Sequence, residues 1–137
     1  MIDSHCHLYV DANPPKQDEL VQEALDSGVE TIICIGIDLE SSRKSIDLAE
    51  KYDAVFATVG LHPHDAKKYH DKLINELRHL AGHKKVVAVG ECGLDYYRNL
   101  SPKNIQKKVF AAQLDLAAEL QKPLVIHTRE SLEDVIS

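Results

Sequence analysis

Alternating strand and helix patterns run through this chain and constrain its fold more than any other feature. Short apolar segments rich in β-branched residues predict strands at 2–8, 31–37, 54–61, 85–91 and 124–127. Apolar residues at helical spacing predict helices over 17–27, 38–51, within 65–81, over 101–120 and from 129 onward. Strands that alternate with helices pair in parallel through right-handed crossovers. The sequence therefore predicts one α/β domain that spans residues 1–137.

Single residues mark several of the predicted helix ends. Gly28 follows the first helical pattern at a position where glycine favours helix termination. Asp38 precedes the second pattern and is a favoured N-cap residue. Pro102 is expected at the first position of the fourth helix, where its missing N–H costs nothing.

Two architectures fit five such units. An open flavodoxin-like sheet with helices on both faces has about this size. The alternative is five of the eight units of a (β/α)₈ barrel, which usually needs about 250 residues. The length of 137 residues favours the open sheet. In both folds, ligands bind at the carboxyl ends of the strands.

Composition excludes some classes of function. Sixteen Lys and Arg against 22 Asp and Glu give a formal charge of −6, which argues against a histone-like protein with a basic face. The apolar runs are shorter than the ~20 residues that span a bilayer, and the first residues do not resemble a signal peptide. Three cysteines, Cys6, Cys34 and Cys92, cannot all pair with one another. We therefore expect a cytoplasmic protein in a reducing compartment that makes no membrane contact.

Ionisable side chains gather at the predicted carboxyl ends of four strands. They are His5 and His7, His62 and His64, Glu91, and His127. A buried polar group left unpaired costs about 1–3 kcal/mol, and a shared metal ion would satisfy several at once. The interpretation that needs no metal is a set of solvated or capping side chains, which are common at strand ends.

The pair His5 and His7 is a metal-binding pattern. Residues i and i+2 of a strand point to the same face, so both imidazoles can bind one cation, with Asp3 as a supporting acceptor. Imidazole suits zinc, manganese or iron, and a carboxylate from elsewhere can complete or bridge the site. Glu91 and His127 at equivalent strand ends favour the metal interpretation over two isolated histidines.

Other residues near these ends leave two interpretations open. Gly90 and Gly93 lie on either side of Glu91, and glycine at these positions permits another backbone segment to approach closely. Arg129 could bind a phosphate or carboxylate through its planar guanidinium. It could equally begin the fifth helix beside Glu130 without a further role.

Four segments carry a family pattern: IDSHCHL at 2–8, GLHPH at 60–64, GECGLDYY at 90–97 and PLVIHTR at 123–129. In this order and spacing they resemble the TatD family of metal-dependent deoxyribonucleases. The helix before the fifth strand also resembles that of the family, at Gln106, Phe110, Gln113, Leu114, Ala117 and Leu120. Such proteins are TIM barrels of the amidohydrolase type. The resemblance thus implies an incomplete barrel of parallel β/α units, about five of eight, rather than an open sheet.

The resemblance also implies two divalent metal ions, which could be Mg²⁺, Mn²⁺ or Zn²⁺. His5 and His7 would bind one ion, His127 would bind the other, and Glu91 would bridge the two. The reaction implied is hydrolysis of phosphodiester bonds in DNA, with the ions activating the attacking water. DNA as a substrate fits an acidic chain if metal ions, rather than a basic surface, meet the phosphate.

The remaining roles concern the substrate. His62 and His64 would act in catalysis with Glu91 and would lie near the substrate phosphate, where Arg129 is a weaker candidate. Asp95 would stabilise the loop after the fourth strand. Two alternatives remain open: a hydrolase of the same superfamily acting on an amide or lactone, and a metal-binding fragment without activity.

The family pattern continues for three further β/α units, from which it draws another histidine and an aspartate as metal ligands. No residue of this chain can be assigned either role, so we expect cleavage by this chain alone to be impaired. We expect the chain to be an N-terminal portion of such a domain, or a short protein that self-associates through its open sheet edges.

Overall fold

A computed structural model describes residues 1–10 and 13–137. Its five strands form one parallel sheet and are β1 (Ile2–Cys6), β2 (Thr31–Ile35), β3 (Val55–Val59), β4 (Val86–Asp95) and β5 (Leu124–Arg129). The α-helices are α1 (Pro14–Asp26), α2 (Leu39–Lys51), α3 (Asp71–Ala81), α4 (Lys103–Leu120) and α5 (Leu132–Ile136). Two 3₁₀ segments, η1 (Leu8–Val10) and η2 (Pro63–Lys68), follow β1 and β3.

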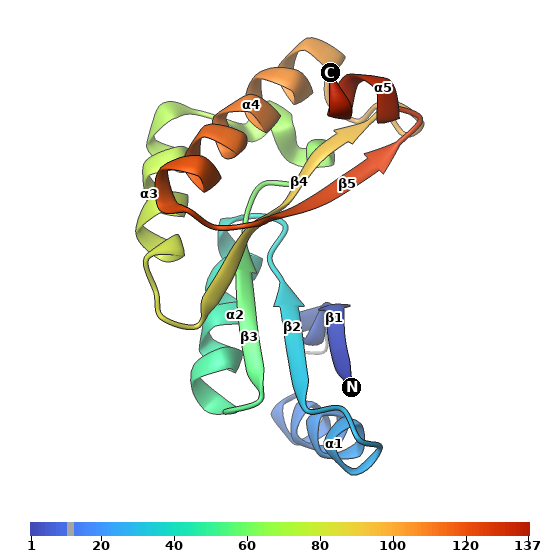
Figure 1. The fold of residues 1–137 in the computed structure, drawn as a ribbon, viewed down its shortest axis with the longest axis vertical. Coiled ribbons are helices and arrows are strands. Elements are labelled where there is room, and N and C mark those ends of the chain that lie inside the picture. Colours follow the sequence, from blue (N-terminus) through green and yellow to red (C-terminus); the bar gives the residue numbers. More distant parts are fainter. Residues whose placement is uncertain (11–12) are drawn as a thin grey trace.

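The order of the strands decides between the two candidate architectures. The strands lie side by side in chain order, β1-β2-β3-β4-β5. An open flavodoxin-like sheet would instead have the order 2-1-3-4-5. Figure 1 shows the strand direction turning steadily, so that β5 crosses the direction of β2. The fold is therefore a curled half-barrel, as the family resemblance implies, and the preference for an open sheet drawn from length alone is wrong.

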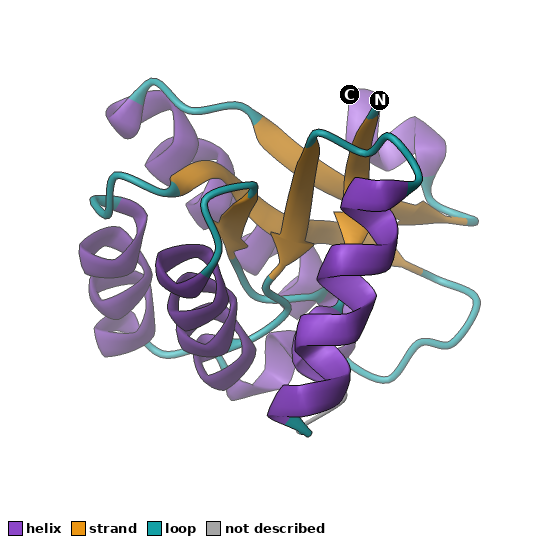
Figure 2. Cartoon of the chain, turned by 90° about the horizontal axis from the view of Figure 1, so that it is seen from below, coloured by secondary structure: helices purple, strands orange, loops and turns teal. Residues whose placement is uncertain are grey.

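The two faces of this curved sheet differ in burial. Side chains on the outer face, such as Cys34, Val55 and Ala57, are fully buried and share one core with the helices. The helices lie around the outside of the sheet (Figure 2). On the inner face, Ile33 and Val87 stay partly exposed beside a hollow of about 460 Å³. The outer face is thus packed in the middle of the sheet and the inner face stays accessible at Ile33 and Val87, whereas β1 and β5 contain no buried residue.

Several predicted ends are confirmed and others move by a few residues. Gly28 follows α1 with a φ of +87°, and the Asp38 carboxylate caps α2 by accepting the Ser41 amide at 2.8 Å. Pro102 is the N-cap residue of α4 rather than its first helical residue. The strand predicted to end at Glu91 continues to Asp95. Over the described residues, the structure has no helix with the length and apolarity needed to cross a membrane.

Candidate metal centre

His7 follows β1 and is held by two contacts at one ring nitrogen. Its Nδ1 lies 3.1 Å from the carbonyl oxygen of Ile35 and 2.8 Å from the Tyr9 hydroxyl. Because a carbonyl only accepts, we assign the ring proton to Nδ1, which leaves the lone pair of Nε2 free for a cation. Burial raises the pKa of Tyr9 to about 12, so its hydroxyl stays protonated.

Glu91 lies at the centre of the site, and its two carboxylate oxygens face different histidines. Oε2 lies 3.6 Å from Nε2 of His5, whereas Oε1 lies 3.2 Å from Nδ1 of His127 and 3.8 Å from Nε2 of His62. The backbone N–H of Glu91 donates to the Gly36 carbonyl at 2.7 Å. One nearly buried carboxylate thus connects the histidines of β1 with those of η2 and β5.

Two groups of side chains could each bind a cation. The potential ligand atoms of His5, His7 and Glu91 all lie within 4.8 Å of one another. Those of His62, His64 and His127 meet the same limit. Bonds from zinc to nitrogen or oxygen are about 2.0–2.2 Å, so small side-chain rotations would bring such atoms onto one ion. The donor set of imidazoles and one carboxylate fits a zinc- or manganese-type ion.

Asp95 holds two of the site histidines. Its Oδ2 lies 2.7 Å from Nε2 of His64 and 3.0 Å from Nε2 of His127, while Oδ1 accepts the Arg98 amide at 2.8 Å. Burial disfavours ionisation of this carboxyl, but the hydrogen bonds from Arg98, His64 and His127 outweigh burial and lower the pKa of Asp95 to about 2. The predicted loop role is present, but the contact with the histidines was missed.

A pattern in the sequence could have revealed this second role of Asp95. Glu91, Gly93 and Asp95 are alternate residues, so in one continuous strand they share a face. The strand predicted from the sequence ends at Glu91, which leaves the following acid in a loop. Extending the strand by four residues puts both carboxylates on the side of the histidines.

His62 is nearly buried and is the N-cap residue of η2. Its Nδ1 accepts the backbone N–H of His64 at 3.2 Å, so we assign the proton of the neutral ring to Nε2, which faces Glu91. Burial, followed by the charges of His127 and His64, lowers the pKa of His62 to about 3. In this arrangement the neutral imidazole of His62 presents an N–H donor towards Glu91.

Two buried glutamines of α4 position the segments that carry the site. The side-chain amide of Gln113 pairs with both backbone groups of Leu61, at 2.8 and 3.0 Å. Gln106 pairs in the same way with the backbone of Asp95, at 2.8 and 3.1 Å. These contacts fix the backbone before His62 and at the end of β4. They explain why polar residues occupy core positions of α4, where apolar residues would otherwise be expected.

Two of the sequence candidates do not join the cluster. The carboxylate of Asp3 accepts the backbone N–H of His5 at 3.1 Å rather than contacting an imidazole. Arg129 ends β5 rather than beginning a helix, and its guanidinium carbon lies 3.8 Å from the ring centroid of Tyr97. The other candidates, His5, His7, His62, His64, Glu91 and His127, lie together.

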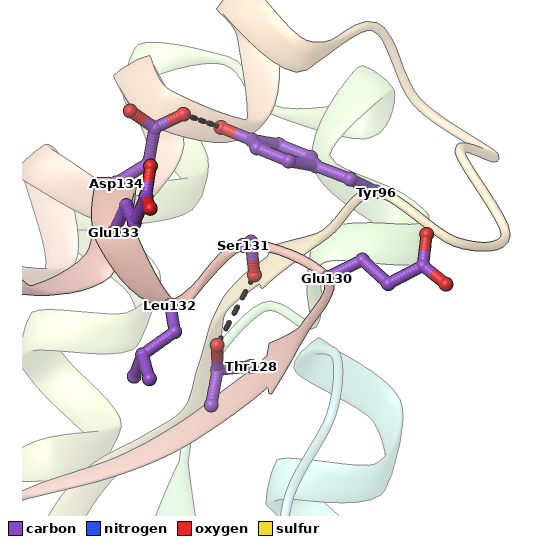
Figure 3. Close-up of a pocket in the computed structure, with 7 residues that line it drawn as sticks. All are labelled: Tyr96, Thr128, Glu130, Ser131, Leu132, Glu133 and Asp134. Carbon is purple, nitrogen blue, oxygen red and sulfur yellow. Dashed lines mark hydrogen bonds between the residues drawn. The ribbon is translucent and has the colours of Figure 1, made fainter.

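The histidine site opens into a cavity of about 320 Å³ lined by His7, Tyr9, Val10, Ile37, His62, His64 and Glu91. A larger hollow of about 640 Å³ lies beside α5 and contains none of these residues (Figure 3). Three acidic side chains, Glu130, Glu133 and Asp134, line it, and the Tyr96 hydroxyl donates to Asp134 at 2.6 Å. We place the candidate functional site in the smaller cavity, because its lining includes Glu91 and three of the clustered histidines.

Comparison with known protein sequences assigns the chain to a family. The sequence model of the family described as "TatD related DNase" matches residues 2–137. The chain belongs to this family. Three cysteines of this TatD-family chain are free, and two of them, Cys34 and Cys92, are buried. The described residues therefore contain no disulfide.

Three relatives show how similar this TatD-family chain is to individual proteins. It is 37% identical over 137 residues to the uncharacterized metal-dependent hydrolase YabD of Bacillus subtilis, covering all of this chain and 54% of the relative. It is 43% identical over 115 residues to the 3'-5' ssDNA/RNA exonuclease TatD of Cronobacter sakazakii, covering 84% of this chain and 44% of the relative. The crystal structure of YJJV, a TatD homologue from Escherichia coli K12, superposes with a TM-score of 0.85 at 33% identity, covering 98% of this chain and 53% of that one. The chain thus spans about half the length of the curated relatives that it matches.

Proposed function

We propose that this site is a two-metal hydrolytic centre that cleaves phosphodiester bonds of single-stranded DNA. The observation that carries the proposal is the position of Glu91, whose two oxygens face His5 on one side and His127 on the other. A carboxylate in this position can bridge two cations, one held by His5 and His7 and the other by His127. The names of the relatives, a metal-dependent hydrolase and a 3'-5' ssDNA/RNA exonuclease, support the same reaction class.

Each side chain then has a defined task. His5 and His7 would hold one ion, His127 would hold the other, and Glu91 would contact both. When bound, divalent ions supply Lewis-acid activation of the attacking water and neutralise charge on the phosphoryl and leaving oxygens. Asp95 keeps the ring of His127 oriented through its contact with Nε2.

His62 and His64 would contact the substrate. The Nε2–H of His62, which faces Glu91, can donate a hydrogen bond to a phosphate oxygen without adding charge, because this imidazole is neutral at pH 7. Asp95 fixes Nε2 of His64 at 2.7 Å, which orients that ring at the rim of the cavity. The formal charge of −6 is compatible with a polyanionic substrate, because bound cations would make the site locally positive.

Cleavage of an end-labelled single-stranded oligodeoxynucleotide tests the proposal. The reaction is run with Mg²⁺, Mn²⁺ or Zn²⁺, with EDTA as the metal-free arm. Glu91→Gln keeps the shape of the side chain and removes its charge, and it is expected to lower the cleavage rate at least about 100-fold. Glu119→Gln is the matched control, because Glu119 lies on the exposed side of α4 and pairs with Arg78. Equal cleavage by both variants, or no metal-dependent cleavage by the folded chain, would contradict the proposal.

A further inference from the structure

Tyr97 and Arg129 form a contact at the same sheet edge as the histidines. Arg129 is the register partner of Asp95 across β4 and β5, and its carbonyl accepts the Tyr96 amide at 2.9 Å. Tyr97 follows Asp95 by two residues, so the two Cα atoms are at most about 7 Å apart. Because Asp95 contacts His64 and His127, the contact between Tyr97 and Arg129 borders the proposed metal centre.

The ring of Tyr97 is unusual in its exposure. Five cation–ring contacts occur among the described residues, and in the other four a lysine lies over a partly buried ring. Tyr97 instead keeps 59% of its surface exposed, with the Arg129 guanidinium 3.8 Å from its centroid. The guanidinium therefore restrains the ring without covering all of it.

The positive charge of Arg129 is not neutralised by an ion pair among the described residues. Within residues 1–10 and 13–137, no carboxylate lies within ion-pair distance of its guanidinium. A planar cation stacked on an aromatic ring keeps its N–H groups at the edge of the plane, where they can bind an anion such as phosphate. The contact thus presents a flat π-surface and a free cation at one place.

We propose that Tyr97 and Arg129 form a base-stacking subsite for single-stranded nucleic acid, next to the phosphodiester bond that is cleaved. This proposal rests on the proposed function and extends it to a nucleotide that flanks the reacting phosphate. An exposed ring that is already restrained loses little freedom when a base stacks on it. Stacking accepts any base, because every base has a π-face, and its contribution does not depend on the sign of the chain's net charge of −6.

The chain contains no tryptophan, which permits a direct spectroscopic test. Tyr97→Trp introduces a single tryptophan at the subsite, and a stacked base is expected to quench its emission. The probes are a short phosphorothioate-linked oligothymidylate, which resists cleavage, and an abasic strand of the same length and linkage. Quenching by the base-bearing strand alone is the expected result. Tyr52→Trp, at the C-terminal end of α2, is the control that should not respond.

Affinities from fluorescence anisotropy with Mn²⁺ present complete the test. Tyr97→Ala is expected to weaken binding of the base-bearing strand about 10-fold and to leave binding of the abasic strand unchanged. Tyr97→Phe, which keeps the ring, and Leu100→Ala, on the same exposed loop, should stay within about 2-fold of the parent chain. Equal weakening of both strands by Tyr97→Ala, or absence of quenching while the strand binds, would overturn the stacking proposal.

The same samples separate this proposal from the proposed function. Base-dependent quenching without metal-dependent cleavage would support the subsite and contradict the hydrolytic centre. Cleavage that depends on Glu91 but not on the ring of Tyr97 would support the centre and overturn the subsite. Failure of the parent chain to bind either strand would overturn both.

Discussion

Nε2 of His127 lies 3.0 Å from Oδ2 of Asp95, while Nδ1 of the same ring lies 3.2 Å from Oε1 of Glu91. One imidazole is therefore held between two carboxylates of β4, at the end of β5. Contacts of this kind fix the orientation of a ligand ring before a metal binds. Asp95 does this for His64 as well, at 2.7 Å, so a single carboxylate orients two histidines.

Asp95→Asn is expected to lower both Mn²⁺ affinity and cleavage rate by about 10–100-fold, which is the usual effect of removing a residue that orients metal ligands. Asparagine keeps an acceptor for the Arg98 amide but cannot satisfy both imidazoles with a negative charge. Isothermal titration calorimetry gives the affinity. Asp115→Asn, on an exposed position of α4, is the control. An unchanged affinity in Asp95→Asn would show that His127 needs no such support.

The lowered pKa of His62 makes stability depend on pH in a defined direction. Its folded pKa is about 3 and its ordinary value is 6.5, because burial and the neighbouring His127 and His64 disfavour the charged ring, against an opposing effect of Asp95 and Asp65. Between these two values the unfolded chain binds a proton that the folded chain does not. Stability is therefore lost as the pH falls from about 6.5 towards 3, by up to about 1.4 kcal/mol per pH unit for this one group.

Urea unfolding in EDTA across that pH window measures this slope. His62→Gln should reduce the slope by the contribution of one proton, whereas His79→Gln, on the exposed side of α3, should leave it unchanged. Identical slopes in the parent chain and His62→Gln would mean that His62 titrates normally in the folded state.

Gln113→Leu is expected to destabilise the chain by about 2–4 kcal/mol. Leucine fills a similar volume but leaves the N–H and C=O of Leu61 buried and without their side-chain partner. Gln22→Leu, at an exposed position of α1, should change the free energy of unfolding by no more than about 0.5 kcal/mol. The urea midpoints of the two variants measure this difference in stability. Equal midpoints would contradict a positioning role of Gln113.

Gly93→Ala should disturb the pairing of β4 with β5. The φ of Gly93 is +133°, and a Cβ there would lie 2.1 Å from the backbone oxygen of His127, which cannot rotate away. We expect a loss of at least about 1–3 kcal/mol from backbone strain, together with weaker metal binding. Gly82→Ala is the comparison, because Gly82 has a helical φ of −71° and its nearest neighbour would be 3.3 Å away. Similar stability of the two variants would contradict this account of the close approach.

Much of the fold could be predicted from the sequence, because local signals set the elements. The cap at Asp38 and the left-handed Gly28 act within a few residues, and both are where the sequence places them. The choice between barrel and open sheet was different. It depends on which strands become neighbours, and the length of the chain favours the wrong fold, whereas the family motifs favour the observed one.

The site was predictable in its members but not in its connections. Histidines and an acid at strand ends predict a cluster, because parallel strands bring their carboxyl ends together. The contact of Asp95 with two imidazoles depends on a strand that continues past Glu91. The local signal for that extension is the alternation of apolar Cys92 and Leu94 with the residues that face the site. The placement of Arg129 on Tyr97 follows from the backbone register of Asp95 with Arg129, which no local pattern encodes. Self-association through β1 and β5 stays a prediction.

The most direct test of the two-metal centre is an anomalous difference map from a crystal of this chain soaked in Mn²⁺. The account predicts two peaks on either side of the Glu91 carboxylate, one within bonding distance of His5 and His7 and the other within bonding distance of His127. A map with no peak at Glu91, or with manganese only at other carboxylates, would contradict the account.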